Sequence, residues 1–273
     1  MSGNRACYVC CVYFGDRRRT ISDYEQDRLC FLKKQIETLN SFHHNLDLIV
    51  FSINIEPEHY AYMNQALKII PSKIQNTPVE VFLRKNIGLS YGAYSETFMR
   101  HRQNFDYFVF NEDDYFFVEN DWDAYLMTKY NSLPNSGYLC GVQRDEDPNW
   151  NGNRIHAGHS SGIASTRALS MVWEKYGCLP HCSDSNEYAS LEEVQKEFGH
   201  SFVKVGLRVY DVREEYQVAI ARTEEDVEDV WRWFSWNDKD LIVPAIIAFD
   251  KPYTWWESFD GPCLRRTNLE KYE

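Results

Sequence analysis

Residues 6–14 read ACYVCCVYF, an unbroken run of apolar and β-favouring side chains. A run of this length without polar alternation is typical of a strand buried on both faces of a parallel sheet. The run ends at Gly15-Asp16, and leucine and isoleucine then recur at helical spacing between residues 23 and 42. This order predicts a buried strand followed by a helix that covers the sheet.

The alternation of strand and helix continues downstream. The next expected strands are residues 46–55, 79–84 and 105–110, and the helices that connect them are residues 57–70 and 91–102. Further on we expect short strands at residues 138–142 and 202–209, and helices at 166–176 and 191–198. Alternating strands and helices with short connections predict an α/β fold with a mostly parallel sheet and right-handed crossovers.

Composition restricts the classes of protein that fit. The chain has 273 residues, of which 44% are hydrophobic, and no Pro/Gly/Ser-rich linker divides it, so we expect one domain spanning residues 1–273. Its 29 Lys+Arg against 41 Asp+Glu give a net charge of −12, which disfavours nucleic acid as a partner. No stretch approaches the ~20 apolar residues of a membrane span, and we expect a cytoplasmic protein.

The eight cysteines are scattered, and several lie in apolar runs. We expect free thiols that pack as small hydrophobic groups. The spacing Cys7-x-x-Cys10-Cys11 has no second Cys/His pair at zinc-binding distance in the sequence, so core packing is favoured over a metal site.

Residues 107–115, YFVFNEDDY, place three adjacent carboxylates directly after a hydrophobic strand. In a parallel α/β sheet ligands collect at the carboxyl ends of the strands. A divalent cation would relieve the repulsion among Glu112, Asp113 and Asp114 and could also bridge two phosphate oxygens. A solvated acidic turn is the alternative, and the position after a buried strand favours the cation.

Residues 84–93, RKNIGLSYGA, stand between the third expected strand and the acidic segment. Together with Glu112-x-Asp114, a variant of the DxD signature, this order of motifs resembles the GT-A glycosyltransferases over residues 5–210. The resemblance implies that Asp114 and Glu112 hold Mn²⁺ or Mg²⁺, and that Glu112 or Asp113 contacts the ribose or a metal-bound water. The donor pocket would be lined by four residues of the upstream motif, namely Arg84, Lys85, Asn86 and Gly88, with Arg84 or Lys85 donating to the diphosphate.

The second half of the chain supplies the other implied roles. Residues 156–166 are small enough for an acceptor sugar to lie against backbone, which suggests an acceptor site with His159, Ser161 and Gly162, joined by Trp236. An acidic pair opens the helix expected at residue 191, as in inverting GT-A enzymes, and makes Glu193 the candidate general base, followed by Glu192 and Asp184. Acidic residues in a first helical turn are also favoured by the helix dipole alone, and both explanations stand.

The resemblance implies a Rossmann-like GT-A fold with a nucleotide-sugar-binding half at residues 5–137 and a smaller acceptor-side half at 138–273. It implies transfer from a nucleotide-sugar to a glycan or glycoprotein acceptor, with inversion. The phrase FVFNEDDYFF is similar to glycosyltransferases that large chlorella viruses encode for capsid glycans, which suggests UDP-xylose or UDP-glucose as donor and the host cytoplasm as location. A metal-dependent nucleotidyltransferase and a non-catalytic carbohydrate-binding relative are the alternatives.

Overall fold

The computed structural model describes residues 4–15, 27–86, 89–113, 115–117, 119–140, 161–177, 179, 198–199, 201–211 and 265–266. The first elements are β1 (Ala6–Tyr13), α2 (Cys30–Ser41), β2 (Leu48–Ile55), η2 (Pro57–His59), α3 (Tyr60–Ile69), β3 (Lys73–Ile74), β4 (Thr77–Lys85) and α4 (Leu89–His101). Those that follow are β5 (Tyr107–Glu112), β6 (Tyr115–Phe116), α5 (Trp122–Ser132), β7 (Ser136–Cys140), β8 (Gly162–Ser165), α6 (Thr166–Tyr176), β9 (Arg208–Asp211) and β10 (Arg265–Arg266).

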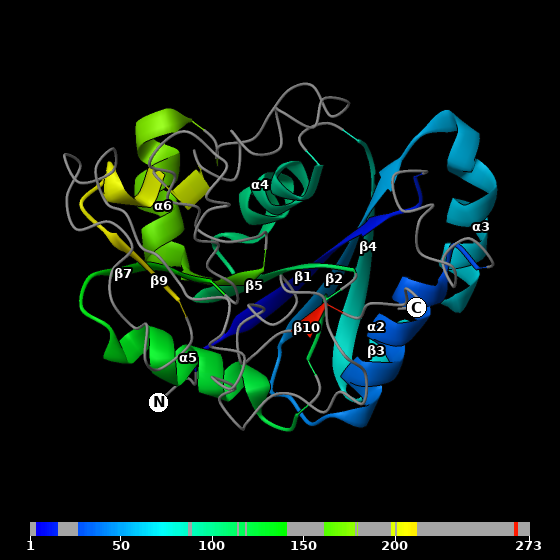
Figure 1. The fold of residues 1–273 in the computed structure, drawn as a ribbon, viewed down its shortest axis with the longest axis horizontal. Coiled ribbons are helices and arrows are strands. Elements are labelled where there is room, and N and C mark those ends of the chain that lie inside the picture. The colour runs from blue at the N-terminus through cyan, green and yellow to red at the C-terminus, as the bar shows by residue number, and fades with distance from the viewer. Residues whose placement is uncertain are drawn as a thin grey trace, which may run out of the picture.

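Eight of the described strands form one sheet in the order β3-β4-β2-β1-β5-β8-β7-β9 (Figure 1). The four central strands β4, β2, β1 and β5 are parallel, β8 is antiparallel to both β5 and β7, and β9 is parallel to β7. This confirms the predicted mostly parallel α/β sheet flanked by helices, consistent with a Rossmann-like GT-A fold. Strands from the second half of the chain belong to the same sheet as β1.

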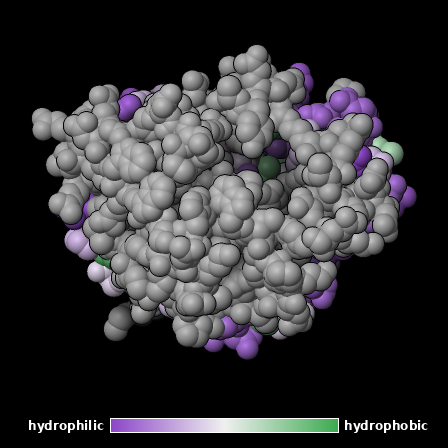
Figure 2. All heavy atoms as spheres, viewed as in Figure 1, coloured by the Kyte–Doolittle hydropathy of each residue, from purple (hydrophilic) through white to green (hydrophobic). Residues whose placement is uncertain are grey.

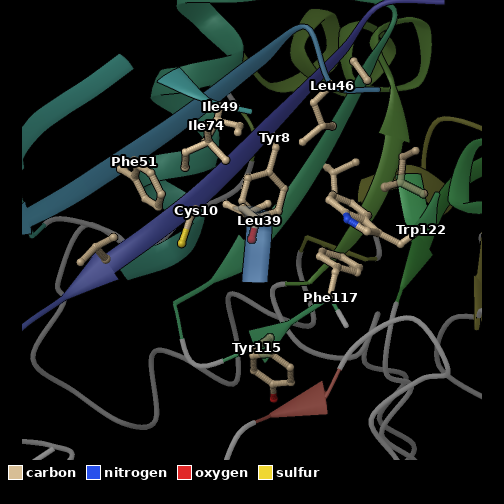
Figure 3. Packing of buried hydrophobic residues seen from close by; sticks show 14 of the residues in the cluster. Tyr8, Cys10, Leu39, Leu46, Ile49, Phe51, Ile74, Tyr115, Phe117 and Trp122 are labelled. Atoms are coloured by element: carbon tan, nitrogen blue, oxygen red, sulfur yellow. The ribbon is translucent and has the colours of Figure 1, made fainter. Parts of the chain in front are cut away.

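Strand β1 is buried on both of its faces. Tyr8 and Cys10 pack in a cluster with side chains of α2 and α5, whereas Val9 and Cys11 pack in a second cluster with side chains of α4 and α6. Figure 3 shows Tyr8 of β1 beside Phe117 and Trp122, and the ring centroids of Tyr8 and Trp122 are 5.7 Å apart. A strand with no solvent face explains the unbroken apolar run at residues 6–14.

The helices change face where the strand order reverses. After β1 and β2 the chain crosses over through α2 and α3, which pack on one face of the sheet, and after β4 it crosses through α4 on the other face. Right-handed crossovers require this change when the next strand is added on the opposite side. Strand β5 therefore joins β1 on the edge away from β2, and the boundary between β1 and β5 is a topological switch point.

The described cysteines do not form disulfides, and all but Cys30 are buried; they are Cys7, Cys10, Cys11, Cys30 and Cys140. Burial, with a smaller contribution from the charges of Glu80 and Asp47, raises the pKa of the Cys7 thiol well above its usual value. A protonated thiol is a poor nucleophile and a poor metal ligand, so Cys7 packs as an apolar group.

The predicted strand at residues 202–209 is wrong over its first half. Residues 201–203 are helical, and strand β9 begins only at Arg208. Phe198 and Phe202 are four residues apart, and their rings pack with centroids 5.3 Å apart, as on one face of a helix. Gly206, with φ of 80°, then turns the chain into β9.

None of the helices in the described ranges is long and apolar enough to cross a membrane. On the face seen in Figure 2, the described residues that reach the surface are mostly hydrophilic and lie toward its margins. The apolar side chains of these ranges lie mainly in the two clusters on either side of the sheet.

Candidate functional site

The acidic segment lies at the carboxyl end of β5, beside β1 at the topological switch point. The Asp113 side chain is only 1% exposed. Its backbone N–H donates to the carbonyl of Cys11 at 3.1 Å, and its Oδ2 accepts a hydrogen bond from the backbone N–H of Tyr13, also at 3.1 Å. Asp113 thus fastens the turn after β5 to the end of β1.

Glu112 projects from the opposite face of β5 to Asn111, because successive side chains of a strand alternate. Its carboxylate is half-buried on the side of α4. Burial raises the pKa of Tyr94 and of Tyr138 well above their usual values, and the negative charge of Glu112 adds to both shifts. Glu112 is thus partly exposed to solvent, whereas the neighbouring Asp113 is buried and accepts a hydrogen bond from the Tyr13 backbone.

Asn111 holds the end of β5 in place through buried hydrogen bonds. Its Nδ2 donates to the hydroxyl of Tyr8 at 2.6 Å and to the carbonyl of Tyr115 at 2.8 Å, and its Oδ1 accepts from Ser161 Oγ at 3.0 Å. Both Asn111 and Ser161 are completely buried. A buried amide whose donors and acceptor are bound to three separate elements fixes the end of β5 in one position.

Gln35 of α2 holds the same turn through its backbone. Its Nε2 donates to the carbonyls of Glu112 at 3.3 Å, Asp113 at 3.1 Å and Tyr115, while its Oε1 accepts from the Tyr8 hydroxyl at 2.9 Å. Burial raises the pKa of Tyr8 well above its usual value, so this hydroxyl stays a neutral donor. A single buried amide thereby fixes the backbone carbonyls of Glu112, Asp113 and Tyr115 at the end of β5.

A second group of polar side chains lies at the carboxyl ends of β1, β2 and β4. Glu56, which follows β2, accepts hydrogen bonds from Asn86 Nδ2 at 2.7 Å and from the Tyr13 hydroxyl at 3.4 Å. His59 Nδ1 lies 3.3 Å from Glu56 Oε2. Since Tyr13 also donates its N–H to Asp113, it links this group to the acidic turn.

Arg84 and Lys85, both predicted to meet a diphosphate, differ in their surroundings. The Arg84 side chain is only 9% exposed, and its guanidinium bonds to Glu96 at 3.1 Å and to the side chain of Asn54. Lys85 is exposed at the end of β4. The Arg84 guanidinium therefore bonds to side chains of the protein itself, and Lys85 is the more accessible cation of the pair.

Ser161 and Gly162, predicted to line an acceptor site, are buried at the start of β8. A Cβ on Gly162 would lie 2.4 Å from the carbonyl oxygen of Leu139, so the glycine permits β7 and β8 to approach. The close approach of β7 and β8 explains why a glycine stands at position 162, and the acceptor role of Ser161 and Gly162 stays a prediction.

Several predicted site residues lie outside the described part of the chain. They are Gly88, Asp114, His159, Asp184, Glu192, Glu193 and Trp236. Their roles stay predictions. For a divalent cation at the acidic turn, the described part offers the oxygen-rich chemistry that such ions prefer through the partly exposed carboxylate of Glu112.

The predicted site lacked Tyr13, Gln35, Glu56 and His59. Glu56 follows a buried strand as directly as the acidic segment does, so the rule that ligand sites form at carboxyl ends could have found it. Gln35 gives no such signal, because a glutamine within a helix is indistinguishable in the sequence from an exposed one.

Comparisons with known proteins give only remote likeness. No protein-family model matches the chain, and no curated protein matches its sequence. Among solved structures, 4-diphosphocytidyl-2C-methyl-D-erythritol synthase from Anaerococcus prevotii is similar, with a TM-score of 0.44 and 10% identity over 82% of this chain and 93% of that one. HddC from Yersinia pseudotuberculosis (TM-score 0.34, 16% identity, 67% and 83% covered) and mouse xyloside xylosyltransferase 1 (0.36, 8%, 71% and 81%) are similar too. Likeness at this level does not establish what the chain does.

Proposed function

We propose that this protein is a divalent-metal-dependent glycosyltransferase that moves a sugar from a nucleotide-sugar donor to a carbohydrate acceptor. The observation that supports it is the place of the acidic turn. Glu112 ends, and Asp113 follows, the strand that borders β1 at the topological switch point, where open α/β sheets bind their ligands. A solvated acidic turn would need neither this position nor the buried amides of Gln35 and Asn111 beneath it.

The negative charge of the chain favours a bound cation for such a donor. With a net charge of −12, the protein repels a diphosphate, and a bound Mn²⁺ or Mg²⁺ would neutralise the charge that develops on the leaving nucleoside diphosphate. Glu112, together with Asp114, would hold the ion. Gln35 and Asn111 bond to the backbone carbonyls of Asp113 and Tyr115, on either side of position 114, and the accessible Lys85 would bind the diphosphate.

The donor class and the stereochemistry extend this proposal. A UDP-sugar, for which UDP-xylose and UDP-glucose are the first choices, follows from the resemblance described above. Inversion would require a carboxylate that takes the proton of the acceptor hydroxyl, and Glu193 is the first candidate, with Glu192 and Asp184 next. Such a base contributes roughly 10²–10⁴-fold in rate.

The proposal is tested by donor hydrolysis and transfer with and without manganese. Asp114→Asn should abolish the metal-dependent reaction while leaving the unfolding transition in place, because a single carboxylate at a loop contributes little to the core. Glu37→Gln, which changes the charge equally at an exposed site on α2, is the matched control. Manganese-dependent activity in Asp114→Asn equal to the wild type would remove the metal role.

The products distinguish the remaining alternatives. A glycosyltransferase releases a nucleoside diphosphate from the donor, whereas a nucleotidyltransferase releases pyrophosphate from a nucleoside triphosphate. A carbohydrate-binding relative releases neither. Glu193→Gln should lower transfer by ~10² or more with nearly unchanged donor affinity. If Glu193→Gln, Glu192→Gln and Asp184→Asn all stay active, a retaining mechanism replaces inversion.

A further inference from the structure

The side chains of Glu56, Glu58 and His59 converge directly after β2. Each offers one ligand atom, and these three atoms all lie within 4.8 Å of one another. We propose that they bind a divalent transition-metal ion, with Zn²⁺ the best fitted, at a site separate from the acidic turn. This site does not depend on the proposed glycosyl transfer.

The distance between the His59 and Glu56 ligand atoms suits a tetrahedral ion better than a plain ion pair. His59 Nδ1 and Glu56 Oε2 are 3.3 Å apart. A tetrahedral site with metal–ligand bonds of about 2.0–2.1 Å separates its ligand atoms by about 3.3–3.4 Å. A charge-assisted hydrogen bond would be shorter, at about 2.7–2.9 Å. One imidazole and two carboxylates form a donor set that Zn²⁺ accepts.

The chain holds two of the three ligands in place before an ion arrives. Pro57 restricts the backbone of Glu56 to an extended conformation and has a fixed φ of its own. The His59 side chain is only 9% exposed, and its ring packs near the rings of Tyr13 and Tyr62, with centroids 6.4 Å away in each case. Glu58 is exposed, so its side chain is free to move by the small distance that closure around an ion requires, and the site opens to solvent there.

Asn86 provides an independent indication of a ligand. The residue is 8% exposed, and its Nδ2 donates to Glu56 Oε1 at 2.7 Å, so the amide nitrogen is directed at the cluster. Its Oδ1 is buried and has no hydrogen-bond partner among the described residues. Because the two terminal atoms of an amide are about 2.2 Å apart, this oxygen lies within about 5 Å of Glu56 Oε1. An ion at the cluster, or a water bound to it, would satisfy this oxygen.

The site is separate from the acidic turn because its ligands follow a different strand. Glu56 continues β2, whereas Glu112 and Asp113 end β5, and β1 lies between these two strands. Tyr13 of β1 contacts both groups, through its hydroxyl and its backbone N–H respectively. The two groups would therefore bind ions separately, and each can be removed without the other.

The test is metal binding by the whole chain, without donor or acceptor. The protein is first freed of metal by a chelator and then titrated with Co²⁺, whose visible absorption reports tetrahedral coordination, and with Zn²⁺ in competition. The wild type should bind both ions. Glu58→Gln and His59→Gln should weaken binding by at least about 100-fold, and Asn86→Leu by roughly 10–100-fold, the usual effect of losing a partner that orients a ligand.

The matched control is Glu37→Gln, an exposed glutamate on α2 that should leave both titrations unchanged. Glu58→Gln is decisive if His59→Gln does not fold, since Glu58 is exposed and its removal disturbs no packing. The proposal is overturned if the wild type binds neither ion, or if Glu58→Gln binds them as the wild type does. Asp114→Asn should retain the Co²⁺ spectrum, so loss of transfer in that variant and loss of this site are separate results.

Discussion

The two halves of the sheet's carboxyl edge are stabilised in different ways. Between β1 and β5, the turn at Asp113 rests on the buried amides of Gln35 and Asn111. The Tyr8 hydroxyl joins these two amides in one closed network, because it donates to Gln35 and accepts from Asn111. At the ends of β2 and β4, Glu56 is partly exposed, and the buried oxygen of the Asn86 side chain has no hydrogen-bond partner within the described part of the chain. The first half is suited to holding carboxylates in one position, and the second half is suited to receiving a ligand that completes it.

The largest effect is expected where the closed network is broken. Gln35→Glu replaces the donor to three carbonyls by a buried carboxyl group, and the free energy of unfolding should fall by more than about 3 kcal/mol. Urea unfolding followed by circular dichroism measures this. Gln75 is a matched control, because its Nε2 also donates to three carbonyls, those of Leu39, Asn40 and Phe42, but in an exposed position. Gln75→Glu should cost about 1 kcal/mol, and equal losses in both variants would contradict the contrast.

A smaller difference in stability is expected between variants of Arg84 and Lys85, the two cations at the end of β4. Arg84→Met removes a guanidinium that bonds to Glu96 and Asn54, and should cost about 2 kcal/mol of stability. Lys85→Met should change stability by less than about 0.5 kcal/mol, because Lys85 is exposed. Donor titration by calorimetry should show the reverse order, with the larger loss of affinity in Lys85→Met. A donor affinity that falls only in Arg84→Met would assign the diphosphate to Arg84.

The connection between the halves is tested by Gly15→Ala. A Cβ on Gly15 would lie 1.7 Å from the Tyr13 hydroxyl oxygen, so the phenol must move away from Glu56. Because a side chain can move more easily than backbone, we expect a loss of about 1 kcal/mol in urea unfolding. No loss at all would mean that Tyr13 already occupies another position in solution.

The smallest effect is expected for Tyr13→Phe. It removes a hydroxyl whose contacts with Glu56, at 3.4 Å to each oxygen, are at the long end of hydrogen bonding, and it leaves the backbone bond to Asp113 intact. Unfolding should change by about 0.5 kcal/mol or less. A loss above about 1.5 kcal/mol would show that the hydroxyl couples the two halves more strongly than these distances indicate.

Much of the fold was predictable because its central strands are buried on both faces. An apolar run such as residues 6–14 has few alternatives once it is flanked by turn residues, and the predicted strand differs from β1 by a single residue. The helix predicted at residues 166–176 matches α6 at both ends, where Ser165 caps the first turn and Gly177 adopts φ of 74° after the last. These local signals need no knowledge of the rest of the chain.

Predictions were weaker where partners distant in sequence decide the structure. Helix α5 was not predicted. Its buried Trp122, Leu126 and Tyr130 are four residues apart, but the buried Asp123 and the partly exposed Tyr125 and Met127 obscure that pattern in the sequence. Strand β8 was not predicted, and its residues were interpreted only as part of a small-residue acceptor segment. A strand of four residues is specified mainly by its pairing with neighbouring strands. The acidic turn could be predicted from its own residues. The amides of Gln35 and Asn111 that hold it could not, because their bonding partners are distant in the sequence.

The bond between Ser161 and Asn111 has a consequence for biosynthesis. The four parallel strands and their crossovers are complete by residue 112, so this part of the sheet can assemble early as the chain leaves the ribosome. Asn111 receives its partner 50 residues later, when β8 is added antiparallel to β5. Contacts of long sequence separation close late because their loops cost more entropy. A nascent chain therefore carries its acidic turn without the Ser161 hydrogen bond until residue 161 has emerged, and truncations between these points should yield a sheet in which the end of β5 is loose.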